Sequence, residues 1–359
     1  MLSRALCFGL ILGLSWFSSA RAASVVFLNP GLSDETFWVS YTRFMQAAAD
    51  DLGMQLHVLY GERQAQRQLA QLRTVLQDAH KPDYLVLVNE QYAAPEMMRL
   101  ARDSGIKLLL VNNGLTRSQA DAVRAHPEAY APLLGTLMTN DEQAGYQMLH
   151  DLVASLPASN EPVELLAFAG INTTPASQLR ERGMRRALVQ FPRVRLRQVV
   201  SGGWSRQRAF EQAQILVQRY PNIRLVWSAN DEMAFGAMQA FEAAGRVPGK
   251  DVLFSAVNSS PQALQARVDG RLSVLMGGHF SLGGWAMVML HDDASGLPLG
   301  RDGQRVRRLP VLQTIDAARA KRWLALGARP NYGIDFQHYS AQGKSADYRY
   351  PFLASPVEY

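Results

Sequence analysis

The sequence predicts an α/β protein made of two doubly wound lobes of parallel sheet that are joined by a hinge. Short apolar runs alternate with longer segments whose apolar residues recur with helical spacing, as in a parallel sheet covered on both faces by helices. This alternation stops at a polar stretch that contains prolines, residues 115–132, and then starts again. The 359 residues are also enough for about two domains.

The first half of the chain alternates strands with helices in a regular order. A glycine, Gly53 or Gly105, follows two of the helical patterns, where a helix commonly ends. The expected strands are residues 24–29, 55–60, 84–89 and 107–112, and the expected helices are residues 36–52, 66–78 and 95–104.

The second half repeats the same order. Residues 272–276 and 283–290 are then expected to return the chain to the first lobe. The expected strands are residues 163–169, 194–200, 225–227 and 252–257, and the expected helices are residues 142–156, 177–191, 207–220 and 261–268, with a further helix directly after residue 231.

These two halves define the expected domain boundaries, with residues 115–132 as a connection between the lobes. Residues 331–359 carry aromatic rings without a period, so we expect an irregular extension that packs on the surface through its rings, or alternatively docks a partner. The expected N-terminal lobe is residues 23–135 and 278–305, and the expected C-terminal lobe is residues 136–277 and 306–330.

The amino end of the chain has the three parts of a secretory signal peptide. Arg4 supplies a positive start, residues 6–17 form an apolar run, and Ala20-Arg21-Ala22 has the small-x-small form of a cleavage site. We therefore expect residues 1–22 to be cleaved and the mature protein to be periplasmic. An uncleaved membrane anchor is the alternative, but the apolar run is shorter than the roughly 20 residues that an anchor needs.

Composition excludes several classes of function. The only cysteine, Cys7, lies in the signal, so the mature chain is expected to have no disulfide, cysteine-based zinc site or cysteine nucleophile. The net charge of +6 falls to +4 without the two arginines of residues 1–22. Such a mild excess does not predict nucleic-acid binding.

The most informative stretch is Leu225–Met238, which reads as a buried strand, a polar turn and a helix. The turn should lie at the carboxyl edge of the sheet, where open α/β sheets bind ligands. Asn230 in this turn offers one acceptor and two donors, which suits a small polyhydroxylated ligand. The alternative is a helix cap with no ligand.

This stretch and two others resemble periplasmic sugar-binding proteins of the ribose-binding type, a family with the type I, lac-repressor-like fold. The similar segments are Ala229–Ala237 (ANDEMAFGA), Thr174–Ala187 (TPASQLRERGMRRA) and Ser33–Trp38 (SDETFW). The resemblance covers nearly the whole mature chain to about residue 330. It implies two lobes that close by a hinge motion on a sugar, without enzymatic chemistry.

The resemblance also assigns ligand-binding roles at the ends of successive strands. Phe37, Trp38 and Trp204 would stack on the flat face of a sugar, and the alternative for each ring is core packing. The implied polar contacts are Arg180, whose planar fork binds oxygens, Asn230, Asn112, Asn258 and His279, with Glu35 added if it points inward.

Two departures from the family bear on the ligand. Asn112 and Asn258 stand where the family has carboxylates, so we expect a more positive pocket around Arg180, and a modified sugar or sugar acid is at least as suitable as ribose. His279 stands where many members have a glutamine, as a pH-sensitive contact or as a structural residue.

The expected function is therefore capture of a sugar-like molecule and presentation of the closed form to an ABC-type importer in the inner membrane. The alternative is a ligand-sensing subunit that signals to a membrane histidine kinase or cyclase. No motif for a serine hydrolase, zinc protease, phosphate loop or dinucleotide site occurs, so we expect no enzyme, cofactor or metal. A monomer is expected, and a DNA-binding regulator would need a helix-turn-helix where the signal stands.

Overall fold

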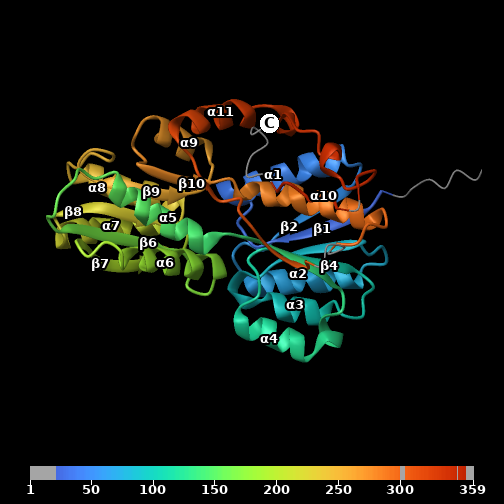
Figure 1. Cartoon of the computed structure of the whole chain (residues 1–359). Coiled ribbons are helices and arrows are strands. Elements are labelled where there is room, and N and C mark those ends of the chain that lie inside the picture. Colours follow the sequence, from blue (N-terminus) through green and yellow to red (C-terminus); the bar gives the residue numbers. More distant parts are fainter. Residues whose placement is uncertain (1–21, 300–303, 346, 353–359) are drawn as a thin grey trace, which may run out of the picture.

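The computed structural model describes residues 22–299, 304–345 and 347–352, and it shows the two lobes that the sequence predicts (Figure 1). Each lobe is a six-stranded sheet with helices on both faces. The expected signal peptide, except for its last residue, lies outside the described residues. Among the described residues, none of the helices is both long and apolar enough to cross a membrane.

The first lobe has the strand order β11-β5-β4-β3-β1-β2, and all of its strands are parallel. Its strands are β1 (Ser24–Asn29), β2 (Gln55–Tyr60), β3 (Tyr84–Val88), β4 (Lys107–Asn112), β5 (Leu133–Thr139) and β11 (Val306–Leu309). Its helices are α1 (Thr36–Asp51), α2 (Ala65–Gln77), α3 (Ala94–Leu100), α4 (Arg117–Ala125) and α10 (Leu282–Ala294).

The second lobe has the order β12-β10-β9-β8-β6-β7, parallel except for β12. Its strands are β6 (Val163–Ala169), β7 (Val194–Ser201), β8 (Ile223–Ser228), β9 (Leu253–Val257), β10 (Val274–Gly277) and β12 (Gln313–Thr314). Its helices are α5 (Asp141–Ala154), α6 (Pro175–Leu188), α7 (Arg206–Arg219), α8 (Asp231–Ala243), α9 (Pro261–Val268) and α11 (Ala317–Gly327).

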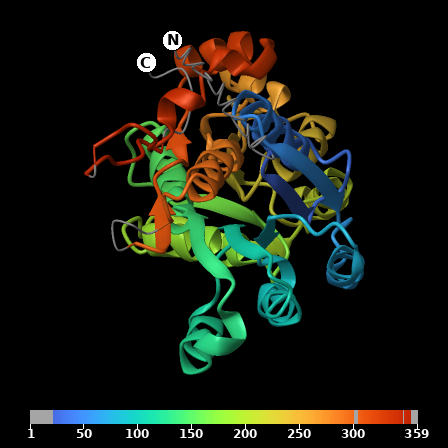
Figure 2. The ribbon, with the colours of Figure 1, turned by 90° about the vertical axis from the view of Figure 1, so that its right-hand side faces the viewer.

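Successive residues of β1 show why the first sheet is buried on both faces. Val25 and Phe27 pack toward α1 and α10, whereas Val26 and Leu28 pack toward α2 and α3. Figure 2 shows the sheet between these two groups of helices. A strand with apolar residues on both faces needs cover on both faces, and the continuous apolar runs of the sequence reflect this.

Before α11, the chain passes between the described parts of the lobes at three places: from β5 to α5, from β10 to α10, and from β11 to β12. The crossing from β10 to α10 falls at the expected boundary after residue 277, whereas the other two follow residues 139 and 309 instead of residues 135 and 305. Residues 115–132 stay in the first lobe, where α4 has no buried residue, so their polarity reflects a solvated helix. Residues 306–309 form β11 beside β5 in the first sheet, and four residues are too few to show a period.

The C-terminal segment forms a strap over both lobes (Figure 1). Its helix α11 packs on α9 of the second lobe, and residues 331–352 return to the first lobe. There Phe336 packs against Phe44 with ring centroids 5.4 Å apart, and its backbone N–H donates to Asp51 at 2.6 Å. Tyr350 donates its hydroxyl proton to Asp292 at 2.6 Å.

The strap rings should therefore stabilise the first lobe. Phe336 is only 4% exposed, so Phe336→Ala should lower the free energy of unfolding by about 3 kcal/mol, measured by urea denaturation. The control Val189→Ala changes a side chain that is 83% exposed and should stay within about 0.5 kcal/mol of wild type. Equal stabilities of the two variants would show that the strap does not contribute to the fold.

Candidate ligand-binding site

One cavity between the lobes collects the carboxyl ends of strands from both sheets. It offers about 370 Å³ of space, its open mouth included. All nine residues singled out in the sequence lie around it: Glu35, Phe37, Trp38, Asn112, Arg180, Trp204, Asn230, Asn258 and His279. Four further residues complete the lining: Arg63, Asn113, Thr174 and Ala176.

Two tryptophan rings face this cavity because two glycines leave room for them. A Cβ atom added to Gly31 would lie 2.1 Å from the Trp38 ring, and one added to Gly170 would lie 2.1 Å from the Trp204 ring. Real Cβ atoms do not approach other atoms so closely. The backbone of Trp204 itself has a φ of 68°, directly after Gly203 with a φ of 62°, and this left-handed pair turns the ring inward.

Arg180 is held rigidly on the second-lobe side of the cavity. Its side chain is buried, and its Nε donates to Asp141 at 2.7 Å while Nη1 donates to the carbonyl of Ala229 at 2.7 Å. Its third nitrogen, Nη2, lies 3.4 Å from Nε2 of His279. The hydroxyl of Thr139 donates to Asp141 as well. The guanidinium fork is therefore oriented before any ligand arrives.

His279 is a neutral residue that stacks on Phe37, with centroids 4.4 Å apart and an interplanar angle of 18°. Burial and the nearby charge of Arg180 hold the His279 pKa well below its usual value, so it does not titrate in the physiological range. Because Arg180 only donates, Nε2 must accept, and the proton then lies on Nδ1. Of the two alternatives for His279, the lowered pKa contradicts the pH-sensitive contact, and the neutral ring presents a fixed donor.

Arg63, which the sequence analysis missed, supplies a second arginine from the first lobe. Its Nε donates to Glu35 at 3.0 Å, its Nη1 donates to Glu90 at 3.1 Å, and Nη2 also contacts Glu35. Glu62 and Arg63 have φ angles of 52° and 57°, so the turn after β2 is left-handed. The position of Arg63 just beyond the end of β2 was the signal that could have found it.

Each arginine at the cavity has at least one carboxylate partner. Arg180 is paired with Asp141 at 2.7 Å, and Arg63 is paired with both Glu35 and Glu90. Glu35, Glu90 and Asp141 thus supply negative charge in place of the carboxylates that the family has at the positions of Asn112 and Asn258. The expectation of a more positive pocket is therefore wrong.

Two side chains of the first lobe reach directly to α6 of the second. Thr174 donates its hydroxyl proton to Glu90 at 2.7 Å, and Asn113 accepts a hydrogen bond from the backbone N–H of Ala176 at 3.1 Å. The N-cap residue of α6, Thr174, makes no capping hydrogen bond through its side chain. Asn113 satisfies one of the free N–H groups of α6 from across the cavity. The described structure is thus the closed arrangement of the lobes.

The asparagines of the second lobe are held by protein partners. Asn230 accepts from the backbone N–H of Met233 at 2.9 Å, as a helix cap, and donates to the carbonyl of Trp204 at 3.2 Å. The cap that the sequence analysis gave as an alternative therefore forms, and the same amide also fixes the backbone of Trp204. Asn258 donates to Asp231 at 2.6 Å.

Four buried polar atoms of the lining have no hydrogen-bond partner within the described residues. They are Nε1 of Trp38, Oδ1 of Asn112, Nε1 of Trp204 and Nδ1 of His279. Each unsatisfied buried group costs about 1–3 kcal/mol, and native proteins contain few of them. Their concentration around one cavity indicates a place for a molecule that both donates and accepts. Within the described residues, no group of three or more histidine, cysteine, aspartate or glutamate side chains could hold a metal ion.

This fold and site define a binding protein that closes on a small molecule. A family model described as a periplasmic binding protein domain matches residues 25–297, so the chain belongs to that family. Members of this family are substrate-binding proteins without enzymatic activity, as expected from the sequence.

One solved structure and two named relatives are similar to this chain over most of their length. A periplasmic sugar-binding protein from Pseudomonas fluorescens has a solved structure that is 55% identical in sequence, covers 92% of this chain and 98% of its own, and superposes with a TM-score of 0.85. The galactofuranose-binding protein of Escherichia coli is 21% identical over 70% of this chain and 77% of its own length. The ribose import binding protein of the same organism is 23% identical over 71% and 79%.

Asp231, which orients Asn258, is a buried carboxyl group whose charge is costly. Burial raises the pKa of Asp231 to about 6, although hydrogen bonds from Ser260 at 2.5 Å and from Asn258 oppose this shift. The folded protein therefore binds the Asp231 proton more tightly than the unfolded chain does. Stability from this group is full below about pH 4 and is lost as the pH rises through about 6.

Replacing Asp231 with asparagine should remove this dependence. The unfolding free energy of wild type relative to Asp231→Asn should fall by up to about 3 kcal/mol between about pH 4 and pH 7, because two pKa units correspond to that energy. Urea denaturation of both proteins across this range measures the difference, and titration of the other carboxyl groups cancels in the comparison. A difference that stays constant or rises with pH would contradict the assignment.

Proposed function

We propose that this protein binds a neutral monosaccharide between its lobes in the periplasm and presents the closed form to an ABC-type importer. The observation that carries the proposal is the set of four unpartnered polar atoms, two of them on tryptophan rings, around one cavity between the lobes. Sugar hydroxyls both donate and accept, and the C–H face of a sugar packs on aromatic rings.

The pairing of both arginines with carboxylates favours a neutral sugar over a sugar acid. Arg63 and Arg180 each have a carboxylate partner, so an anionic ligand would have to compete with Glu35, Glu90 or Asp141 for them. A neutral hydroxyl can instead accept from the outer edge of a paired guanidinium group.

Closure follows from the contacts between the lobes. The bonds that Glu90 and Asn113 make to α6 exist only when the lobes are together. A sugar that satisfies the unpartnered atoms of both lobes binds the closed form better than the open one, and this differential affinity shifts the population.

The relatives favour import over a sensory role, because the ribose and D-apiose proteins among them are named as import binding proteins. These relatives and the family model also support a periplasmic location, with residues 1–22 as the export signal. A permease of the inner membrane is then the partner, and a single copy of the chain provides the complete cavity.

A thermal-shift screen against neutral pentoses and hexoses, in pyranose and furanose forms, and against sugar acids tests the ligand. A neutral sugar at 100 times its dissociation constant should stabilise the wild type by about 2.7 kcal/mol. Trp204→Ala should abolish most of this rise, and Trp204→Phe should keep part of it, because phenylalanine retains the ring but loses the N–H donor.

Arg180→Ala is a poor variant for this screen, since it leaves Asp141 buried without its partner and should itself destabilise the protein by about 3–5 kcal/mol. A response to sugar acids alone would overturn the neutral ligand. An undiminished response of Trp204→Ala would overturn the site.

Arg63 should control affinity by holding Glu90 in place for Thr174. Arg63→Gln leaves Glu90 buried without its cation, so the closed form should be disfavoured and sugar affinity should fall at least about tenfold by calorimetry. Arg99→Gln is the matched control, because Arg99 pairs with Glu96 at 2.7 Å on the exposed surface of α3. It should change affinity less than about twofold, and equal losses in the two variants would refute this role of Arg63.

A further inference from the structure

A second and larger cavity lies at the hinge, next to the candidate sugar site. We call it the hinge cavity, defined by Arg43, Leu264, Phe280, Trp323, Leu326 and Tyr332. It offers about 900 Å³ of space, its open mouth included. Its walls come from α1 of the first lobe, α9 of the second lobe and the C-terminal strap.

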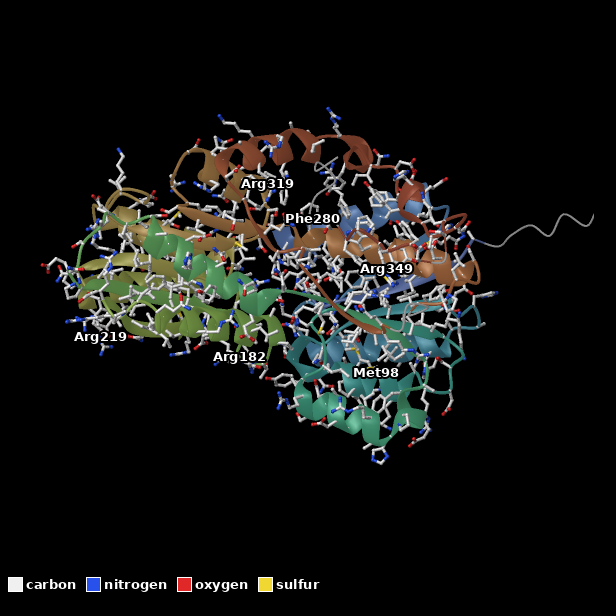
Figure 3. All side chains as sticks on the ribbon, in the orientation of Figure 1. Met98, Arg182, Arg219, Phe280, Arg319 and Arg349 are labelled. Carbon is white, nitrogen blue, oxygen red and sulfur yellow. The ribbon has the colours of Figure 1, made fainter. Side chains whose placement is uncertain are left out.

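The two cavities share the chain segment that crosses from β10 to α10. His279 lines the sugar site, and the next residue, Phe280, lines the hinge cavity. In the same way Asn258 lines the first cavity and Ser259 the second. Gly278, which directly precedes His279 and Phe280, has a φ of 105°, a backbone conformation that favours glycine. Figure 3 shows Phe280 between the lobes, beneath α11.

The walls of the hinge cavity are mainly apolar and aromatic. Leu264 of α9 lies on one side, Leu326 of α11 and Tyr332 lie on another, and the Phe280 ring meets the Trp323 ring edge-on at 6.2 Å. Such walls suit a flat or branched hydrocarbon body, whereas they offer a sugar few polar partners.

One cationic group, Arg43, interrupts these walls and calls for an acceptor. Arg43 has no carboxylate partner within the described residues: its Nη2 lies 3.4 Å from the carbonyl of Arg329, and its guanidinium lies 5.1 Å from the centre of the Tyr332 ring. A cation without a carboxylate partner, set beside apolar walls, matches an anion that carries an apolar body.

We propose that the hinge cavity binds a small aromatic carboxylate or sulfonate, with its ring among the apolar side chains and its anionic group near Arg43. The occupant contacts both lobes at once, so it binds the closed and open arrangements with different affinities and shifts the equilibrium between them. This binding does not depend on the identity of the sugar.

Anilinonaphthalene sulfonate, an aromatic sulfonate whose fluorescence rises in apolar surroundings, is the probe. Titrated with the mature protein, it should give one saturable fluorescence increase. Arg43→Gln should weaken its binding about threefold to fivefold, the effect of a partly exposed ion pair. Arg67→Gln, which changes another exposed arginine on α2, away from the cavity, should leave binding unchanged.

A filling variant tests the location. Gly327 lines the hinge cavity, and a Cβ atom added to it would meet no atom within 4 Å, so Gly327→Phe should fold and should weaken dye binding at least tenfold. Ser40→Trp fills the cavity from α1 and serves as the second variant if Gly327→Phe does not fold. Trp204→Ala should leave the dye titration unchanged, which separates this result from the sugar site.

Three results would overturn the proposal. The first is the absence of a saturable signal, and the second is an equal signal from wild type, Arg43→Gln and the filled variants. The third is loss of the dye signal in Trp204→Ala with retention in Gly327→Phe, which would place the dye in the sugar site.

Discussion

The closed arrangement depends on one buried carboxyl group, Glu90. Burial raises its pKa, and the positive charge of Arg63 opposes that rise. Arg63 and Asn113 hold Glu90 from its own lobe, and Thr174 binds it from the other. Breaking this contact by opening the lobes leaves hydrogen-bonding groups that water must then satisfy. The hydrogen bonds of Glu90 to Thr174 and of Asn113 to Ala176 thus fix the position of closure at the start of α6.

Topology explains why so many functional side chains meet there. In each lobe the polar residues follow parallel strands, and their carboxyl ends share one edge of the sheet. The crossings between lobes turn these two edges toward each other, so that Asn112 of one sheet and Asn230 of the other line the same space. Residues far apart in sequence therefore form one site without any irregular extension of the sheets.

The sequence predicted the two-lobed fold and placed nine residues that line one cavity, because apolar runs mark the strands and polar residues mark their ends. It could not predict how those residues are paired. Asn230 was expected at the site, yet its acceptor caps α8, and Arg63 was missed because its role depends on a left-handed turn and on Glu90. The crossing after β11 was misplaced for a similar reason, because β11 is a four-residue strand that only its neighbour β5 defines.

The missing Cβ atoms at Gly31 and Gly170 couple each glycine to a tryptophan elsewhere in the chain. A larger residue at Gly170 would displace the Trp204 ring, so neither glycine can be enlarged while its tryptophan stays in place. Homologues that recognise other molecules are therefore free to change such a pair together, and the two positions should covary across the family. Redesign of specificity could begin at these glycines, since a single added methyl group there would move both an aromatic wall and its N–H donor.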